Sequence, residues 1–329
     1  RVRGRGGIAA AASTQATTDA GAAPDADGAA LEAAGPPAPA DTWQLDFCSR
    51  PMLDERGKKV WELLVCDETG AVQHAEYFAN NKVNSANLKS ALQRVADEAN
   101  GGVMPTKVRF FRTQMNTIIS RALKDLGIKP VPSRRCAELI SWLDERYDTV
   151  YSVHPGFQAN APPLMAPEQG PLEDLPQELA GSQWAFVELE LGELIEESKS
   201  VRGGSLFGDT IDVEAVADEL GLDMNASVPG VVALSRRAAA VAAWTCGLEV
   251  VALQADDSRA TLVMEAGVST RYRYATWPRN DAAADKEARD WADAKAEVGG
   301  LHFLALQADV DDEDVLGFWA LRDIAMPRA

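Results

Sequence analysis

Three strand patterns follow one another from Trp43 onward, and this order limits the fold of the chain more than any other feature. The stretches TWQLDFCSR, KKVWELLVCD and AVQHAEYF are short runs that mix aliphatic and aromatic residues with polar ones, as half-buried strands do. Residues 67–70, Asp-Glu-Thr-Gly, supply a turn between the last two runs. We therefore predict a meander of three strands at the start of the folded chain.

Helix and strand patterns alternate after this meander. A helix is expected over about 85–100, where one face is apolar and two glycines follow. The next stretches predict a strand (KVRFF), a helix (TQMNTIISRALKDLG), a short strand (IKPV) and a helix (RRCAELISWLDERY). The resulting order, β-β-β-α-β-α-β-α, is that of the ribonuclease-H-like architecture.

A second domain is predicted to begin near Gln183. It opens with WAFVELELGELIEE, and a glycine-rich loop leads to a helix in DTIDVEAVADELGL, with Asp209 as the expected N-cap. A helix (SRRAAAVAAWT), three strands, a helix (DKEARDWADAKAEV) and two last strands give the order α-β-β-β-α-β-β. The fold class predicted for the whole chain is α+β (mixed α/β) with two domains.

Two segments lack the periodicity of folded structure. Residues 1–41 are rich in Ala and Gly, and their first 18 residues carry arginine but no acid, which fits either a plain disordered tail or the remnant of a transit peptide. Residues 155–182 are rich in Pro and Ala and predict a linker. The domains are then expected over 42–154 and 183–329. No apolar run reaches the roughly 18 residues of a membrane-spanning helix.

A basic island lies in the first domain. Residues 107–135 carry eight cations and one acid, Asp125, so their net charge is +7, whereas the whole chain carries −18. An overall negative charge repels polyanions, so a nucleic acid could be bound only by a local patch of this kind. The cations of the island are Lys107, Arg109, Arg112, Arg121, Lys124, Lys129, Arg134 and Arg135.

Helical periodicity organises part of this charge. In the helix expected over 113–126, the apolar residues form one stripe, which leaves Gln114, Thr117, Arg121 and Lys124 as an outward row. On the preceding strand, Phe111 shares a side with Lys107 and Arg109, an arrangement that suits base stacking and phosphate contact.

Arg134 and Arg135 are expected to begin the next helix, where backbone N–H groups favour an anion. The RNA-binding residues predicted from these patterns are Lys107, Arg109, Phe111, Arg112, Arg121, Lys124, Arg134 and Arg135. The alternative is that the cations are solvated or pair with the protein's own acids.

A second basic and aromatic stretch, TRYRYATWPRN, lies in the second domain. Arg271, Arg273 and Arg279 mark a possible second surface for RNA or a partner. If the strand alternates, both tyrosines of the stretch face the opposite side and belong to the core.

Catalysis finds little support in the sequence. A nuclease of this architecture needs clustered carboxylates for Mg²⁺; Asp46 and Glu98 fill two of the places, but the fourth strand ends in Arg112. The four cysteines and three histidines are scattered, without metal-ligand spacing or a nucleophile motif. We therefore expect no enzyme activity, no metal and no cofactor.

Several long stretches resemble the Tab-two-like family. They include WQLDFCSRP, VRFFRTQMNTIISRALKDLGIKPVPSRR, SLFGDTID, EARDWADAKAEVGGLHFLALQ and GFWALRD, in the family's order. The resemblance implies a nucleus-encoded, RNA-binding translation factor of the chloroplast stroma. It further implies that the protein engages the single-stranded 5′ untranslated region of a photosystem I reaction-centre messenger, with the translation machinery as partner and without cofactor or catalysis.

One departure concerns the C-terminus. The family typically carries Trp-Leu-Leu, a tripeptide linked to function, whereas this chain has Trp319-Ala320-Leu321. By resemblance Trp319 and Leu321 are functional residues, and Ala320 leaves room for a paralogue with another client. The alternative function is a non-catalytic protein-interaction scaffold in an organelle complex, since exposed aromatic residues often anchor protein interfaces.

Overall fold

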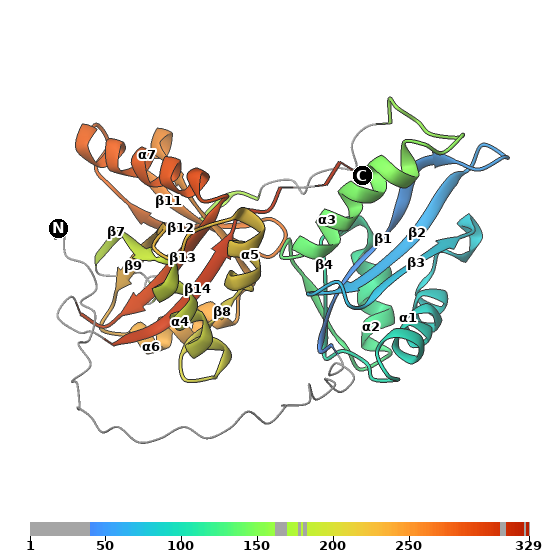
Figure 1. The fold of residues 1–329 in the computed structure, drawn as a ribbon, viewed down its shortest axis with the longest axis horizontal. Helices are drawn as coiled ribbons and strands as arrows, with labels where there is room; N and C mark the ends of the chain where they lie inside the picture. Colours follow the sequence, from blue (N-terminus) through green and yellow to red (C-terminus); the bar gives the residue numbers. More distant parts are fainter. Residues whose placement is uncertain are drawn as a thin grey trace, which may run out of the picture.

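The computed structural model describes residues 40–161, 170–176, 179, 183–309, 314–325 and 327–328. These residues form an N-terminal and a C-terminal part, each with its own sheets (Figure 1). Most of the predicted tail and much of the predicted linker lie outside the described residues. No helix of the described residues is long and apolar enough to cross a membrane.

The N-terminal part contains one five-stranded sheet. Its strands are β1 (Thr42–Leu53), β2 (Lys59–Asp67), β3 (Gln73–Phe78), β4 (Lys107–Phe110) and β5 (Lys129–Pro132). They lie in the order β3-β2-β1-β4-β5. β1, β2 and β3 pair antiparallel, and β4 and β5 continue the sheet parallel to β1. The predicted meander and the ribonuclease-H-like order of elements are confirmed.

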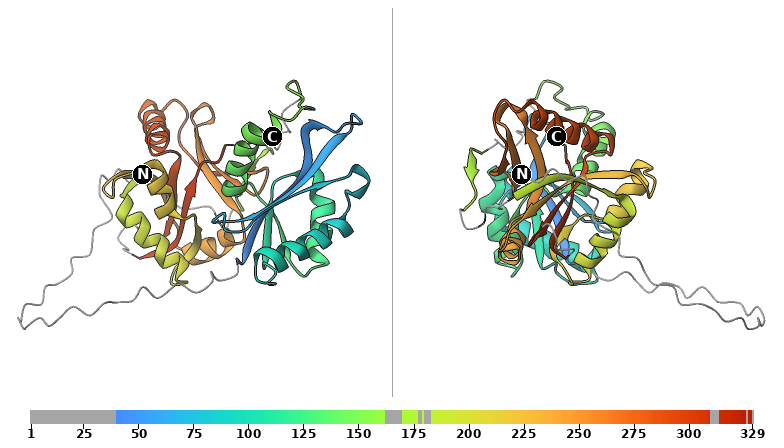
Figure 2. Two further views of the ribbon diagram at one scale, coloured as in Figure 1. Left: turned by 45° about the vertical axis from the view of Figure 1, so that its right-hand side comes forward. Right: turned by 90° about the vertical axis from the view of Figure 1, so that its left-hand side faces the viewer.

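Helices cover both faces of this sheet. α1 (Ser85–Ala99) and α2 (Asn116–Lys124) pack on one face, and α3 (Ala137–Arg146) packs on the other. A short 3-10 helix, Thr113–Met115, precedes α2, and a π-helical turn, Tyr147–Tyr151, follows α3. In Figures 1 and 2, α3 lies on the side of the sheet that faces the C-terminal part.

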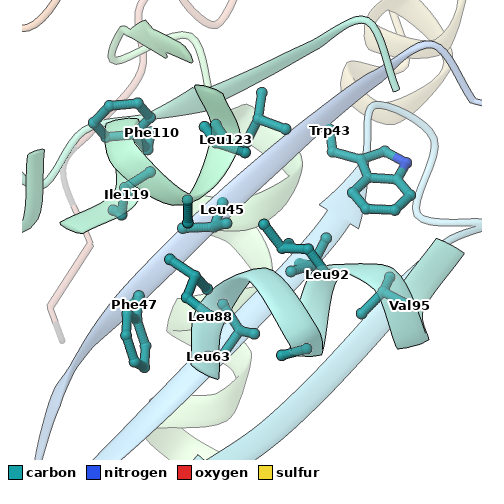
Figure 3. Close-up of a cluster of buried hydrophobic side chains, with 14 of the residues drawn as sticks. Trp43, Leu45, Phe47, Leu63, Leu88, Leu92, Val95, Phe110, Ile119 and Leu123 are labelled. Carbon is teal, nitrogen blue, oxygen red and sulfur yellow. The ribbon is translucent and has the colours of Figure 1, made fainter. Parts of the chain in front are cut away.

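The main N-terminal core lies between the sheet and the helix pair. Figure 3 shows Leu88 and Leu92 of α1 and Ile119 of α2 pointing toward Leu45 and Phe47 of β1. These side chains are fully buried. Burying a side chain of this size stabilises the fold by roughly 1.5–3 kcal/mol, so this core fixes α2 with its opposite face outward.

The C-terminal part contains two sheets. The first has the order β7-β9-β13-β14-β8, with β7 (Gln183–Glu190), β9 (Ser227–Leu234), β13 (Leu301–Gln307), β14 (Val315–Arg322) and β8 (Phe207–Thr210). The second has the order β10-β11-β12-β6, and its strands are β10 (Val250–Asp256), β11 (Thr261–Ala266), β12 (Thr270–Thr276) and β6 (Leu172–Asp174).

Four α-helices and one short helix accompany these strands: α4 (Leu191–Arg202), α5 (Val213–Leu220), α6 (Ala238–Cys246), the 3-10 helix η4 (Asp257–Arg259) and α7 (Ala282–Glu297). From α6 onward the predicted order α-β-β-β-α-β-β is confirmed. The prediction lacked β9, whose sequence SVPGVVAL is buried along nearly its whole length. A strand buried on both faces shows a continuous apolar run and not an alternating pattern.

The prediction that Asp209 caps a helix is wrong. Asp209 lies in β8, and the N-cap of α5 is Asp212, whose side chain accepts a hydrogen bond from the Ala215 N–H at 3.1 Å. Gly208 has φ +150°, and a Cβ there would lie 1.8 Å from the carbonyl oxygen of Phe318. The close pairing of β8 with β14 thus depends on this glycine. In this pairing Asp209 lies opposite Trp319.

Candidate nucleic-acid interface

Burial divides the basic island into two groups. Arg109, Arg112 and Arg135 are 3–8% exposed, and Arg134 is largely buried, with 17% of its side chain exposed. In contrast, Arg121, Lys124 and Lys129 are exposed, and Lys107 is half-buried. The basic island therefore consists of two groups of cations, one largely buried and one exposed to solvent.

Three of the four arginines in the first group, Arg109, Arg134 and Arg135, tie the two parts of the protein together. Arg109 on β4 donates from Nε to Oε2 of Glu249 at 2.8 Å and also pairs with Glu68. Arg135 donates from Nη1 to Oδ2 of Asp209 at 2.5 Å. These contacts join β4 and the loop before α3 to β8 and to the residue before β10, so they form an interface between the domains.

Arg134 extends the same interface. Its Nη2 donates to Oε2 of Glu265 at 2.6 Å, and its backbone N–H donates to the carbonyl of Gly267 at 3.1 Å. The prediction that Arg134 and Arg135 begin a helix is wrong, because α3 begins at Ala137. Both arginines lie in the preceding loop, and their side chains reach the C-terminal part.

The end of the chain adds a further contact between the parts. Arg328 donates from Nε to Oδ1 of Asp144 at 3.1 Å and pairs with Asp148. Figure 1 shows the C-terminus beside α3. The chain therefore leaves the C-terminal sheets and returns to the N-terminal helix.

Arg112 has a different, internal partner. Its Nε donates to Oδ1 of Asp46 at 2.9 Å, and Nη1 of Arg50 donates to Oδ2 of the same carboxylate at 2.6 Å. Burial alone would raise the pKa of Asp46, but the neighbouring Arg112 and Arg50 guanidinium groups outweigh it and hold the pKa below its usual value. Asp46 is thus an ionised, fully buried partner of two arginines.

Glu62 extends this buried network. It accepts from Nε of Arg50 at 2.7 Å and from the hydroxyl of Tyr151 at 2.5 Å, and it pairs with Arg146. The side chains of Arg50, Asp46 and Glu62 have no exposed surface. Every carboxylate in this network therefore has a guanidinium partner, as buried charges require.

This network occupies the carboxylate that a nuclease of this architecture would use to hold magnesium. Both oxygens of Asp46 already accept hydrogen bonds from guanidinium groups. Glu98, the second carboxylate considered in the sequence, is exposed on α1. Within the described ranges, no three His, Cys, Asp or Glu side chains gather as metal ligands would.

The second group of cations lies on the surface of the molecule. The outward row predicted for α2 and its preceding turn is confirmed, since its four residues are all exposed, while Ile119, Ala122 and Leu123 are buried. Lys107 and Lys129 are register partners on β4 and β5, so their strands run side by side about 5 Å apart. We refer to Lys107, Arg121, Lys124 and Lys129 together as the basic surface.

Few acids neutralise the basic surface. Among the residues that the structure describes, no ion pair within 4.0 Å is found for Arg121, Lys124 or Lys129. Lys107 lies near enough to Asp209 to help lower the pKa of that carboxyl, although burial alone would raise it and Arg135 has the larger lowering effect. The cations that remain available to a polyanion are those of α2 and β5.

Phe111 lies in the core. It is 2% exposed and packs with Leu139, Ile140 and Leu143 of α3. The guanidinium group of Arg112 lies 4.8 Å from its ring centroid. The side chain is therefore covered by α3 and by Arg112 and is not presented to solvent.

The C-terminal tripeptide is also buried. Trp319 and Ala320 have no exposed surface and Leu321 is 1% exposed, all within β14, which lies between β13 and β8. Trp319 and Leu321 face one core and Ala320 faces the other, against Phe303 and Phe318. These residues hold the C-terminal sheet together from inside.

The arginines of the stretch around β12 also differ in burial and in their partners. Nε of Arg271 lies 3.8 Å from Oε1 of Glu265, at the interface described above. Arg273 pairs with Asp174, and Arg279 is exposed. The tyrosines, Tyr272 and Tyr274, pack against the C-terminal core as the alternation predicted.

The acids of the interface were missed by sequence reasoning. Glu249 is 140 residues from Arg109, Glu265 is 131 from Arg134, and Asp209 is 74 from Arg135. No local pattern joins residues so far apart. The sequence does show an excess of acidic residues in the second domain. That excess does not indicate which of them pair with the arginines of the first domain.

Fold and site together define a class: a two-domain α/β protein whose N-terminal domain presents an exposed basic helix and encloses a buried arginine–carboxylate network. Residues 42–146 match the family model described as "RNA-binding protein Tab2/Atab2 N terminal", and residues 162–322 match that of the C-terminal domain of the same protein. The chain belongs to the Tab2/Atab2 family of RNA-binding proteins, as the resemblance predicted.

Two relatives have considerable sequence identity. "Protein TAB2 homolog, chloroplastic" of Zea mays is 51% identical over 285 residues, which are 87% of this chain and 72% of the relative. The protein of the same name from Arabidopsis thaliana is 46% identical over 285 residues, 87% of this chain and 75% of the relative. Both relatives are named as chloroplastic.

Among solved structures, the catalytic core domain of the HTLV-2 integrase in complex with magnesium is similar at a TM-score of 0.24. It has 17% sequence identity and covers 36% of this chain and 77% of that one.

Proposed function

We propose that this protein is a non-catalytic RNA-binding translation factor of the chloroplast, which holds the single-stranded leader of a messenger on its basic surface. The observation that carries this proposal is the exposed, unneutralised set of cations on α2 and β5 in a chain of net charge −18. Membership in an RNA-binding family supports it.

The basic surface suits a single strand of RNA for electrostatic reasons. Each phosphate that a lysine or arginine neutralises releases bound counterions, which favours binding and contributes about 0.7 to the salt slope for single strands. Gln114 and Thr117 are exposed on the same helical row and offer hydrogen bonds to sugars or bases. The net charge of −18 repels RNA as a whole, and the exposed cations of α2 oppose this repulsion locally.

The remaining residues of the basic island have a supporting role in this proposal. Arg109, Arg134 and Arg135 hold the C-terminal domain in place, and Arg112 neutralises Asp46. Phe111 fills the core beneath α3. They shape the protein that presents the basic surface and do not themselves contact RNA.

For the client, we propose the 5′ untranslated region of a photosystem I reaction-centre messenger, bound in the chloroplast stroma together with components of the translation machinery. The family resemblance and the chloroplastic relatives support this assignment. Ala320 lies inside the C-terminal core, so this departure from the family tripeptide is a change of packing and not of a surface that could read RNA.

Crosslinking in the organelle, followed by sequencing of the attached RNA, tests this function. The proposal predicts one clustered position in the leader of a photosystem I messenger. A cluster in another leader would keep the RNA-binding function and replace the client. Recovery of protein partners without enriched RNA would overturn the proposal in favour of an interaction scaffold.

A further inference from the structure

A hollow with three arginines lies in the C-terminal domain, apart from the basic surface. Its volume is about 430 Å³, and it is lined by Arg259 of η4, Arg273 of β12 and Arg279 of the loop before α7, together with Trp277, Thr261 and Thr276. Pockets for small organic groups are commonly 300–1,000 Å³ in volume. The hollow is therefore of a size for one nucleotide unit and not for a folded partner.

The floor of the hollow is fixed. Trp277 is 7% exposed, its Nε1 donates to Oδ1 of Asp285 at 2.7 Å, and its backbone N–H donates to the carbonyl of Ala260 at 3.0 Å. Ala260 itself is buried and has φ +52° at the end of η4. These contacts hold the hollow in shape without a ligand, so little ordering is needed when one binds.

The arginines keep donors for a ligand. Arg259 donates to Asp256 at 2.6 Å and Arg273 pairs with Asp174, but a guanidinium group has five N–H donors and each of these side chains remains 39–60% exposed. For Arg279 no ion pair within 4.0 Å is found in the described part of the chain. Three guanidinium-bearing side chains and Thr276 thus line one space.

We infer that this hollow is a second contact for RNA, in which guanidinium groups bind the phosphates of single-stranded RNA. The inference rests on the RNA-binding function proposed above. Planar guanidinium groups bind phosphate oxygens in pairs, and a phosphodiester chain can supply successive phosphates to Arg259 and Arg279. Of the three arginines marked in the sequence, Arg271 is excluded because it faces Glu265, and Arg259 takes its place.

The direct test is salt-dependent binding of a fluorescein-labelled single-stranded RNA to the full chain and to the double variant Arg259→Gln with Arg279→Gln. Weaker binding is expected, with a salt slope lower by about 1.4, which is two phosphates at about 0.7 each. Arg273 is left in place because it holds β6 through Asp174. The matched control is Lys286→Gln with Arg289→Gln on α7, two exposed cations whose loss should leave the slope unchanged.

Folding is checked by the thermal midpoint, and Arg279→Gln alone, at an exposed position, is a second variant with an expected slope change of about 0.7. If the wild-type chain binds RNA and the variants match it in affinity and slope, this inference fails while the proposed function stands. If the wild-type chain binds no RNA, the proposed function fails and this inference with it. Labelled polyglutamate that binds the wild type but not the double variant, with RNA unaffected, would overturn the assignment to RNA.

Discussion

Nε of Arg112 donates a hydrogen bond to Oδ1 of Asp46 at 2.9 Å, and both residues are buried. Arg112 lies two residues after the end of β4, near the place where a nuclease of this architecture would supply a further carboxylate. It neutralises Asp46, the carboxylate that such an enzyme would use for magnesium. Asp46 and Arg112 therefore belong to the buried arginine–carboxylate network of the N-terminal domain. Both oxygens of Asp46 accept hydrogen bonds from guanidinium groups in this structure.

Asp46→Asn should destabilise the protein. The substitution removes the buried carboxylate that Arg50 and Arg112 share, although Arg50 keeps its ion pair with Glu62. Removal of one partner from a buried ion pair costs about 3–5 kcal/mol. Urea unfolding of the wild type and the variant measures this difference. In the same samples we expect no Mg²⁺-dependent cleavage of RNA by either protein. Cleavage by the wild type that is lost in a variant of equal stability would contradict the structural role.

Arg135→Ala should loosen the two domains. The side chain is 7% exposed and bonds to Asp209 across the interface, and a hydrogen bond to a charged group contributes about 1.5–3 kcal/mol. Asp209→Asn should cost a similar amount, and the double variant should cost less than the sum of the two single variants because both remove one interaction. Chemical unfolding of the four proteins measures the coupling; strictly additive losses would show that the pair is not coupled.

Trp319→Ala should unfold the C-terminal domain and not abolish a surface contact. Trp319 has no exposed surface, and replacing a buried tryptophan by alanine costs about 3–5 kcal/mol through lost burial and the cavity left behind. Leu321→Ala should act in the same direction by about 2–5 kcal/mol. Circular dichroism during heating measures both. A variant that loses RNA binding at an unchanged thermal midpoint would contradict the core assignment.

Buried His302 should make stability depend on acid pH. Its Nε2 accepts from the Leu253 N–H at 2.9 Å, and its Nδ1 lies 2.8 Å from the carbonyl oxygen of Gly300, which assigns the neutral tautomer with the proton on Nδ1. Burial, with a smaller contribution from Lys295, lowers its pKa from 6.5 to about 4. The unfolded chain therefore takes up a proton at higher pH than the folded protein does.

The free energy of unfolding should consequently fall by about 3 kcal/mol as pH falls from 6.5 to 4. Above pH 6.5 the stabilising contribution of neutral His302 should be fully present. Urea unfolding across this range measures the slope. His302→Gln should be less stable at neutral pH but show a flatter slope, because it lacks the titrating group. An equal slope in the variant would show that other groups cause the dependence.

Local patterns predicted the parts of the structure that local forces determine. The meander follows from short mixed runs and a turn, and the outward row of α2 follows from the 3.6-residue period that sets Ile119 and Leu123 inward. These predictions need no knowledge of the rest of the chain. β9 was missed because its apolar run is continuous, as expected for a strand covered on both sides.

The role of each cation could not be read from the sequence. Arg112 and Arg121 have the same charge and lie nine positions apart, yet one is buried against Asp46 and the other is exposed. The difference arises because residues distant in sequence approach some of the cations in the fold. Asp46 approaches Arg112, and Asp209 approaches Arg135. Charge counting found the basic island, and only the tertiary structure could divide it into an interface and a surface.

The most direct test of the account is the salt dependence of RNA binding by the variant Arg121→Glu, Lys124→Glu, Lys129→Glu. The matched control is Arg56→Glu, Lys58→Glu, Lys59→Glu, which reverses three exposed cations of the turn after β1 and of the first residue of β2 in the same domain. We expect the first variant to lose binding at physiological salt with an unchanged thermal midpoint, and the control to bind almost as the wild type does. Equal affinity and equal salt slope in the first variant and the wild type would contradict it.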